Sequence, residues 1–134
     1  MPSVQGVDNT QNSTDALEAA KDLARKAQCI VAVSGAVDLV TDGKRVLGVS
    51  NGVALMQRIT ATGCAVTALI AAFVSVNPAR PLESAAYALA LFGLAGEMGS
   101  VRANGPGSLR MHMLDALHAL DEPTVVSQIR IAQI

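Results

Sequence analysis

The residues with the clearest chemical potential form a short turn, residues 59–65, that leads directly into an apolar segment. The first backbone N–H groups of a helix have no acceptor within the helix, and the aligned peptide dipoles place partial positive charge there. The small side chains of Ala61, Thr62 and Gly63 let an anion approach these groups. The turn therefore predicts a phosphate-binding site at a helix N-terminus. An ordinary loop-to-helix turn is the alternative, because no Gly-Lys-Ser/Thr of a Walker loop follows.

The cysteines and histidines add one further candidate. Cys64 falls in the first turn of the expected helix, where a helix N-terminus favours the thiolate, so it is a candidate proton acceptor. A small side chain that fills a tight contact is the alternative for Cys64, and it is the preferred interpretation of Cys29 at the start of an apolar strand. His112 and His118 lie six residues apart, a spacing that does not bring two metal ligands to one helix face. The sequence predicts no metal site.

Helical and β-type segments alternate in the first half of the chain and must position this turn. A helix of about 13 residues, capped by Ser13 or Thr14, precedes residues 29–34, a continuous apolar run. Such a run is typical of a central, parallel-type strand that is covered by helices on both faces. The Asp42-Gly43 pair then lies between two apolar runs and predicts a β-hairpin with a type I′ turn. The expected hairpin strands are residues 37–41 and 44–49.

The second half is expected to be almost wholly helical. The expected helices are residues 62–76, 81–103 and 109–120, and residues 124–130 permit either a short helix or a strand. The most apolar stretches within the first two helices are shorter than the about 20 residues that a bilayer span needs, so we interpret both as buried core helices. The Gly-Pro-Gly-Ser segment at 105–108 is a helix–helix corner or a close approach to a ligand. Glu97 is expected to belong to a solvated helix end.

Composition excludes several functional classes. With 134 residues, of which 51% are hydrophobic, the chain is expected to form one compact domain over residues 1–134, with residues 1–12 as a loop. Ten basic and 11 acidic residues give no field for binding nucleic acid or an anionic membrane. The first residues do not follow the pattern of a signal peptide, and two cysteines fit a reducing compartment. We therefore expect a cytoplasmic α/β protein.

Five motifs, taken in order, resemble those of the hydroxyethylthiazole kinases. They are Ile-Val-Ala-Val-Ser-Gly-Ala-Val-Asp at 30–38, Val-Thr-Asp-Gly at 40–43, Asn-Gly at 51–52 with Leu-Met at 55–56, Thr-Ala-Thr-Gly-Cys-Ala at 60–65, and Gly-Pro-Gly-Ser at 105–108 with Leu-Asp-Ala-Leu at 114–117. Their order and intervals are specific, and the resemblance extends from about Gly6 to Glu122. It implies a ribokinase-like α/β fold with a partial sheet, made of a central strand and a β-hairpin, and a mostly helical C-terminal half.

The activity that the resemblance implies is ATP-dependent phosphorylation of the hydroxyethyl group of 4-methyl-5-(2-hydroxyethyl)thiazole, a step of thiamine salvage. Ser34 falls on an ATP-contacting position that is usually threonine, and Thr62 is likewise implied to contact the nucleotide. Ala61 falls on a substrate-contacting position that is usually glycine. Gly63 and Cys64 match the anion hole and its cysteine, which would stabilise the transferred phosphoryl group and orient or deprotonate the alcohol. In sugar-kinase relatives, an aspartate takes the place of Cys64.

Subunits of the family are about twice as long as this chain. The resemblance therefore implies that the chain corresponds to the C-terminal half of a subunit, and that the other half carries the rest of the sheet and the acidic residues that serve Mg²⁺. It also implies ATP and Mg²⁺ as cofactors, the thiazole alcohol as substrate, and a homotrimer. Two alternatives stay open: a non-catalytic interaction or assembly module on a kinase-derived scaffold, and a kinase for another small alcohol such as a pyrimidine.

Overall fold

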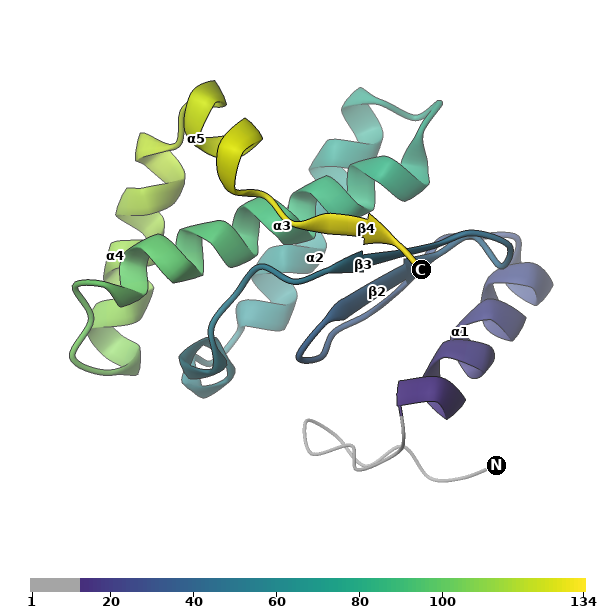
Figure 1. Ribbon diagram of the computed structural model, residues 1–134, viewed down its shortest axis with the longest axis horizontal. Helices are drawn as coiled ribbons and strands as arrows, with labels where there is room; N and C mark the ends of the chain where they lie inside the picture. Colours follow the sequence, from purple (N-terminus) through teal and green to yellow (C-terminus); the bar gives the residue numbers. More distant parts are fainter. Residues whose placement is uncertain (1–12) are drawn as a thin grey trace.

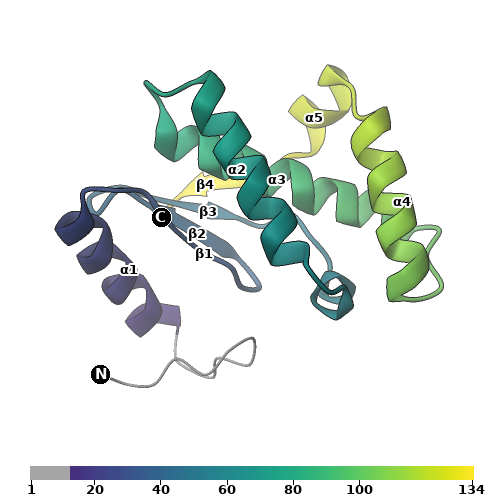
Figure 2. The ribbon, with the colours of Figure 1, turned by 180° about the vertical axis from the view of Figure 1, so that it is seen from behind.

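A computed structural model describes residues 13–134, which form a four-stranded antiparallel sheet and a larger helical part (Figure 1). The elements in chain order are α1 (Ser13–Ala27), β1 (Val31–Val33), β2 (Asp38–Thr41), β3 (Val46–Val49), the 3-10 helix η1 (Ala54–Arg58), α2 (Thr62–Val76), α3 (Pro81–Ser100), α4 (Pro106–Ala119), α5 (Glu122–Gln128) and β4 (Ile131–Gln133). Figures 1 and 2 show α1 on one side of the sheet and α2 with α3 on the other. The expected α/β class with a mostly helical second half is confirmed.

Helix α3 is the centre of the packing. Twelve of its 20 residues are buried, and most of these are alanine, glycine or leucine, so neighbouring elements approach its backbone closely. Val40 and Val49 of the sheet pack against one end of the helix, around Leu82. The other end contacts α4, where Leu109 is fully buried. Each fully buried aliphatic side chain stabilises the folded state by about 1.5–3 kcal/mol. Helix α3 contacts both the strands and the other helices, so it joins the sheet and the helical part into one packed unit.

The predicted β-hairpin is confirmed, but its type I′ turn is wrong. Four residues, 42–45, connect β2 to β3. The Asp42 carboxylate accepts hydrogen bonds from the backbone amides of Lys44 at 2.8 Å and Arg45 at 2.7 Å. Of the Asp42-Gly43 pair, Gly43 alone adopts a positive φ, of 90°. The aspartate thus acts through its side chain and not through a left-handed backbone conformation.

The interpretation of residues 29–34 as a central, parallel-type strand is wrong for this chain. The strand order is β1-β2-β3-β4, so β1 is an edge strand, and it pairs antiparallel with β2. Ala32 and Cys29 are exposed, which also overturns the expectation that Cys29 is buried. A continuous apolar run indicates a strand whose faces can both be covered by other elements. Whether the strand is central depends instead on its two edges, and the outer edge of β1 has no paired strand within residues 13–134.

The two long apolar segments differ in burial. Helix α2 has the predicted bounds, 62–76, but it has no buried residue, so its interpretation as a buried core helix is wrong. Helix α3 is the buried one. No helix within the described residues is long and apolar enough to cross a membrane. For residues 124–130 the helix alternative is confirmed by α5, and the strand β4 begins only after this range, at Ile131.

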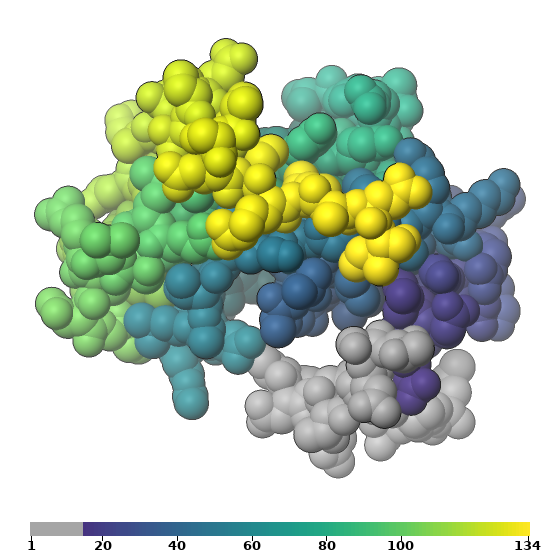
Figure 3. All heavy atoms as spheres, in the orientation of Figure 1, coloured from purple at the N-terminus to yellow at the C-terminus, as the bar shows by residue number. Residues whose placement is uncertain are grey.

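A polar cluster holds the C-terminal strand against α3. The side-chain oxygen of Asn51 accepts a hydrogen bond from the Arg130 amide at 2.6 Å, and its side-chain nitrogen donates to the Gln128 carbonyl at 3.1 Å. Glu97 accepts from the Gly52 amide at 2.7 Å and forms an ion pair with Arg130. Figure 3 shows the segment that these contacts fix, which crosses the surface from α5 to the sheet. Glu97 is therefore not part of a solvated helix end, as expected, but joins three segments.

The Glu97 carboxylate makes stability depend on pH. Burial alone would raise the pKa of Glu97, but the Gly52 amide and the Arg130 guanidinium outweigh it and hold this pKa below its usual range. Because the folded-state pKa is the lower one, the stabilisation is present at neutral pH and is lost as the pH falls from about 4.3 through the folded-state pKa. We expect Glu97→Gln to lower the melting temperature by about 3–6 °C at pH 7 and far less at pH 3. Circular dichroism melts at both pH values measure this, and an equal decrease at both would contradict it.

Candidate functional site

The turn before α2 has an unusual backbone conformation. Ala61, the residue that precedes the helix, has φ of 73° and ψ of 12°, in the left-handed region. The Thr62 hydroxyl donates a hydrogen bond to the carbonyl of Ile59 at 3.2 Å, which closes the turn from inside. Residues other than glycine adopt the left-handed region at a cost of about 1–2 kcal/mol. The turn therefore uses strained backbone to direct the first amides of α2 outward.

These amides are open. The first bond of the helix joins the Ala65 amide to the Ala61 carbonyl at 3.0 Å, and the structure shows no acceptor within residues 13–134 for the amides of residues 62–64. A Cβ atom built on Gly63 would have no heavy atom within 4 Å, so the space beside these groups is free. Thr62 is half-buried, and Ala61, Gly63 and Cys64 are exposed. Free amides at the positive end of a helix dipole can bind an anion.

Ser34 reaches the same end of the molecule from the sheet. It follows β1, and Figures 1 and 2 both show the β1–β2 loop beside the start of α2. The Asp38 carboxylate accepts a hydrogen bond from the Gly35 amide at 2.9 Å and thereby holds this loop. Burial raises the pKa of Asp38, and the Gly35 amide only partly offsets it. The fold thus brings the Ser34 loop to the end where Ala61, Thr62, Gly63 and Cys64 lie.

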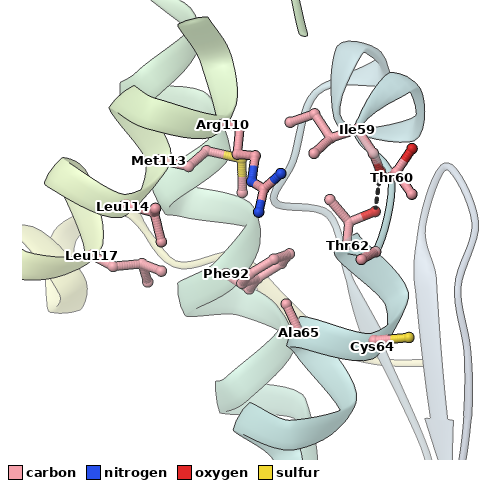
Figure 4. A pocket seen from close by; sticks show the side chains of 11 residues that line it. Ile59, Thr60, Thr62, Cys64, Ala65, Phe92, Arg110, Met113, Leu114 and Leu117 are labelled. Carbon is pink, nitrogen blue, oxygen red and sulfur yellow. Dashed lines mark hydrogen bonds between the residues drawn. The ribbon is translucent and has the colours of Figure 1, made fainter. Parts of the chain in front are cut away.

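A cavity of about 430 Å³ lies on the other side of this turn, between α2, α3 and α4 (Figure 4). Its walls are apolar, and Arg110 of α4 is the charged residue among those that line it. In Figure 4 the Arg110 guanidinium lies above the Phe92 ring, and the Cys64 sulfur points away from the α4 side. Sequence reasoning did not single out Phe92 or Arg110, because each resembles an ordinary helix residue. Only the packing of α3 against α4 brings them to this turn.

The strain at Ala61 leads to a prediction. We expect Ala61→Gly to raise the free energy of unfolding by about 1 kcal/mol, because glycine adopts the left-handed region without steric cost. Ala68→Gly is the matched control, since Ala68 is an exposed residue within α2. That substitution should lower the free energy of unfolding by about 1 kcal/mol through helix propensity alone. Urea denaturation measures both, and changes of the same sign would contradict the left-handed conformation.

Comparison with known proteins gives one consistent result. The chain matches the hydroxyethylthiazole kinase family over residues 2–123. It is 62% identical to a hydroxyethylthiazole kinase from Zea mays over 128 residues, which are 96% of this chain and 46% of the relative. It is 53% identical to one from Arabidopsis thaliana over 130 residues, 97% of this chain and 47% of the relative.

The fold agrees with that result. The structure of a hydroxyethylthiazole kinase protein from Pyrococcus horikoshii OT3 matches with a TM-score of 0.84 and 37% identity, over 90% of this chain and 47% of that chain. The chain spans about half the length of the relatives that it matches and corresponds to their C-terminal half. Because the family match includes most of the sequence and the fold matches a solved relative, this chain belongs to the hydroxyethylthiazole kinase family.

Proposed function

We propose that this chain supplies the phosphoryl-binding turn of a kinase that transfers phosphate from ATP to the hydroxyethyl group of 4-methyl-5-(2-hydroxyethyl)thiazole, in thiamine salvage. The observation that carries the proposal is the open N-terminus of α2, whose amides at 62–64 have no acceptor within the described residues. The names of the relatives supply the substrate class. Phosphoryl transfer depends mainly on positioning and on stabilising negative charge, which such a turn provides.

Each residue of the turn has a role in this proposal. The amides around Gly63 hold the transferred phosphoryl group, and the Ser34 hydroxyl binds ATP. The Thr62 hydroxyl also binds ATP, for which it must turn from the Ile59 carbonyl to which it donates here. The Ala61 methyl group lies where the thiazole substrate binds. Cys64 is exposed beside the free amides, and it orients the attacking hydroxyl or accepts its proton.

The Cys64→Ser variant distinguishes two roles of the Cys64 thiol, orienting the attacking hydroxyl and accepting its proton. If Cys64 mainly orients the alcohol, Cys64→Ser retains measurable turnover, because a hydroxyl preserves the hydrogen bond. We expect a decrease of about 10–100-fold in kcat, which is smaller than the about 100–10,000-fold that full loss of acid–base assistance costs. Complete loss of turnover with unchanged ATP binding would contradict an orienting role and show that a thiolate is required.

Magnesium does not fit the residues that the structure describes, 13–134. The described residues contain no group of three or more His, Cys, Asp or Glu side chains that could hold a metal ion. The carboxylate of Asp38, which follows the Ser34 loop, already accepts a hydrogen bond from the Gly35 amide. We propose that Mg²⁺ accompanies ATP but is held by the other half of the subunit, so no step assigned to this chain runs through the ion.

The test is turnover by a complete subunit. The N-terminal part of the Zea mays relative that this chain does not match is joined to the chain, and ADP release is measured with the thiazole alcohol, ATP and Mg²⁺. We expect alcohol-dependent ADP release by the fusion and none by the chain alone. A folded fusion that releases no ADP would overturn the proposal. Light scattering on the same fusion tests the homotrimer that we also propose.

The non-catalytic alternative makes different predictions. An assembly module would form a stable oligomer whose melting temperature does not respond to ATP, and substitution of Cys64 would have no effect. The names of the relatives favour the kinase, because the proteins that this chain resembles over most of its length are hydroxyethylthiazole kinases.

A further inference from the structure

The Asn-Gly and Leu-Met motifs within residues 51–56 have no part in the proposed chemistry, although they lie just before the phosphoryl-binding turn. The Leu-Met pair belongs to η1, a 3-10 helix of five residues that contains no buried residue. In Figures 1 and 2 this short helix lies beside the start of α2. Two residues, Ile59 and Thr60, separate η1 from Ala61. Because so short a connection has little conformational freedom, the position of η1 determines where the turn lies.

Met56 fixes η1 on α3 through a notch in that helix, the space above Gly96. Gly96 is buried, and a Cβ atom added there would overlap the Met56 Sδ atom and lie 3.1 Å from Cγ and 3.2 Å from Cε. The Met56 side chain therefore occupies space that exists only because position 96 has no side chain. The next residue of α3, Glu97, accepts a hydrogen bond from the Gly52 amide at 2.7 Å. Two consecutive residues of α3 thus hold the segment that leads to the turn.

Hydrogen bonds and packing connect Met56 to the first residue of the turn, Ile59. The Met56 amide donates to the Val53 carbonyl at 3.0 Å, and the Met56 carbonyl accepts from the Ile59 amide at 3.1 Å. The Ile59 side chain is buried against Leu109 and Met113 of α4, and Met56 packs against the same cluster. A displacement of Met56 from the notch would therefore move Ile59 and the turn that follows it.

We propose that Met56 is a positioning residue for phosphoryl transfer. Seated in the Gly96 notch, it fixes the distance of the turn from α3 and thereby the direction of the free amides at 62–64. Met56 does not line the cavity beside the turn, so it acts through these amides and not by contact with a substrate. A methionine side chain is flexible, and the notch supplies the constraint that the side chain lacks. The proposal rests on the proposed function of the turn.

The kinetic test uses variants of the fusion described above. Met56→Ala empties the notch, and Gly96→Ala fills it, so that the Met56 side chain must leave. Each should lower kcat for ADP release by about 10–100-fold, because a misplacement of about 1 Å far from the reacting atoms costs about 100-fold. The KM of either substrate should rise less, since misdirected amides lose charge stabilisation mainly in the transition state. Met56→Leu has a similar volume and should keep kcat within about threefold of the parent.

Two further variants separate positioning from stability. If Met56 and Gly96 act through each other, the double variant Met56→Ala/Gly96→Ala loses no more kcat than the larger single loss, whereas independent effects would multiply. Leu82→Val is the control, since Leu82 is fully buried at the other end of α3, against the sheet. It should lower the melting temperature of the fusion by about 2–4 °C. Its kcat should equal that of the parent at a temperature where every variant is folded.

A second measurement does not depend on activity. In heteronuclear NMR spectra of the chain alone, Met56→Ala and Gly96→Ala should both shift the amide resonances of residues 62–64, and Leu82→Val should leave them in place. Met56→Ala removes atoms and adds none, so it provides this comparison even where Gly96→Ala fails to fold.

Three results would overturn the proposal. They are unchanged kcat in both single variants of an active fusion, unmoved amide resonances at 62–64 in both, and a loss of kcat in Leu82→Val as large as in Met56→Ala. A folded parent fusion that releases no ADP would refute the proposed function instead. If the resonances at 62–64 still respond in that case, they support the link from Met56 to the turn, and if they do not, both proposals fail.

Discussion

Replacing Gly93 with alanine is expected to lower the free energy of unfolding by about 2 kcal/mol or more, as measured by urea denaturation. Gly93 is buried in α3 where the segment after β3 crosses the helix. An added Cβ atom would stand 2.5 Å from the Asn51 carbonyl carbon and closer still to its oxygen. Backbone atoms cannot rotate away as a flexible side chain can, so the loop or the helix must move. Overpacking costs about 1–3 kcal/mol, and a clash with backbone atoms places this substitution at or above the upper end, so a loss of about 2 kcal/mol or more remains after the gain of about 1 kcal/mol in helix propensity.

The displacement has a second effect, because Asn51 is also the centre of the cluster that holds the C-terminal strand. Moving its backbone weakens the hydrogen bonds of its side chain to Gln128 and Arg130. Gly107→Ala is the matched control, since Gly107 lies in α4 and a Cβ there would have no heavy atom within 4 Å. That substitution should raise the free energy of unfolding by up to about 1 kcal/mol. Equal changes for the two variants would show that the close approach at Gly93 is absent.

Replacing Gly63 with aspartate is expected to lower kcat/KM of the complete fusion by at least about 100-fold while slightly stabilising the fold. The carboxylate would lie beside the free amides of α2, where we propose that the phosphoryl group binds. The aspartate carboxylate would repel the negatively charged phosphoryl group. For comparison, loss of a single hydrogen-bond donor from an oxyanion hole already lowers kcat by about 100–1,000-fold. For the fold, an acidic residue in the first turn of a helix contributes about 0.3–1 kcal/mol.

Asparagine at the same position separates charge from size. Gly63→Asn adds a side chain of nearly the same shape without the charge, and the space there is free of protein atoms within 4 Å. We expect the kcat/KM of Gly63→Asn to fall by less than about tenfold. The neutral side chain narrows the space for the phosphoryl group but does not repel its charge. Steady-state kinetics of both variants and urea denaturation of both chains provide the comparison. Equal decreases in kcat/KM would indicate that the amides do not bind an anion.

Local signals predicted most of the secondary structure. Helix α2 has the expected bounds, because the small residues of the turn precede it and the Asn77-Pro78 pair follows it. The Asp42-Gly43 pair predicted the hairpin, although the turn is held by the Asp42 side chain and not by the type I′ backbone on which the prediction rested. The ordered motifs indicated the family, and the family match confirms it. These features depend on residues close together in the sequence.

Tertiary structure alone decided the remaining features. Whether β1 is central or at an edge depends on which strands lie beside it, and whether α2 is buried depends on which surfaces cover it. The cluster around Asn51 joins residues up to 79 positions apart, and no local pattern indicates such contacts. Burial and long-range hydrogen bonds are properties of the space around a residue, whereas propensity and capping are properties of its neighbours in the chain. The sequence by itself therefore determined the elements and the candidate turn, and the fold decided what each of them faces.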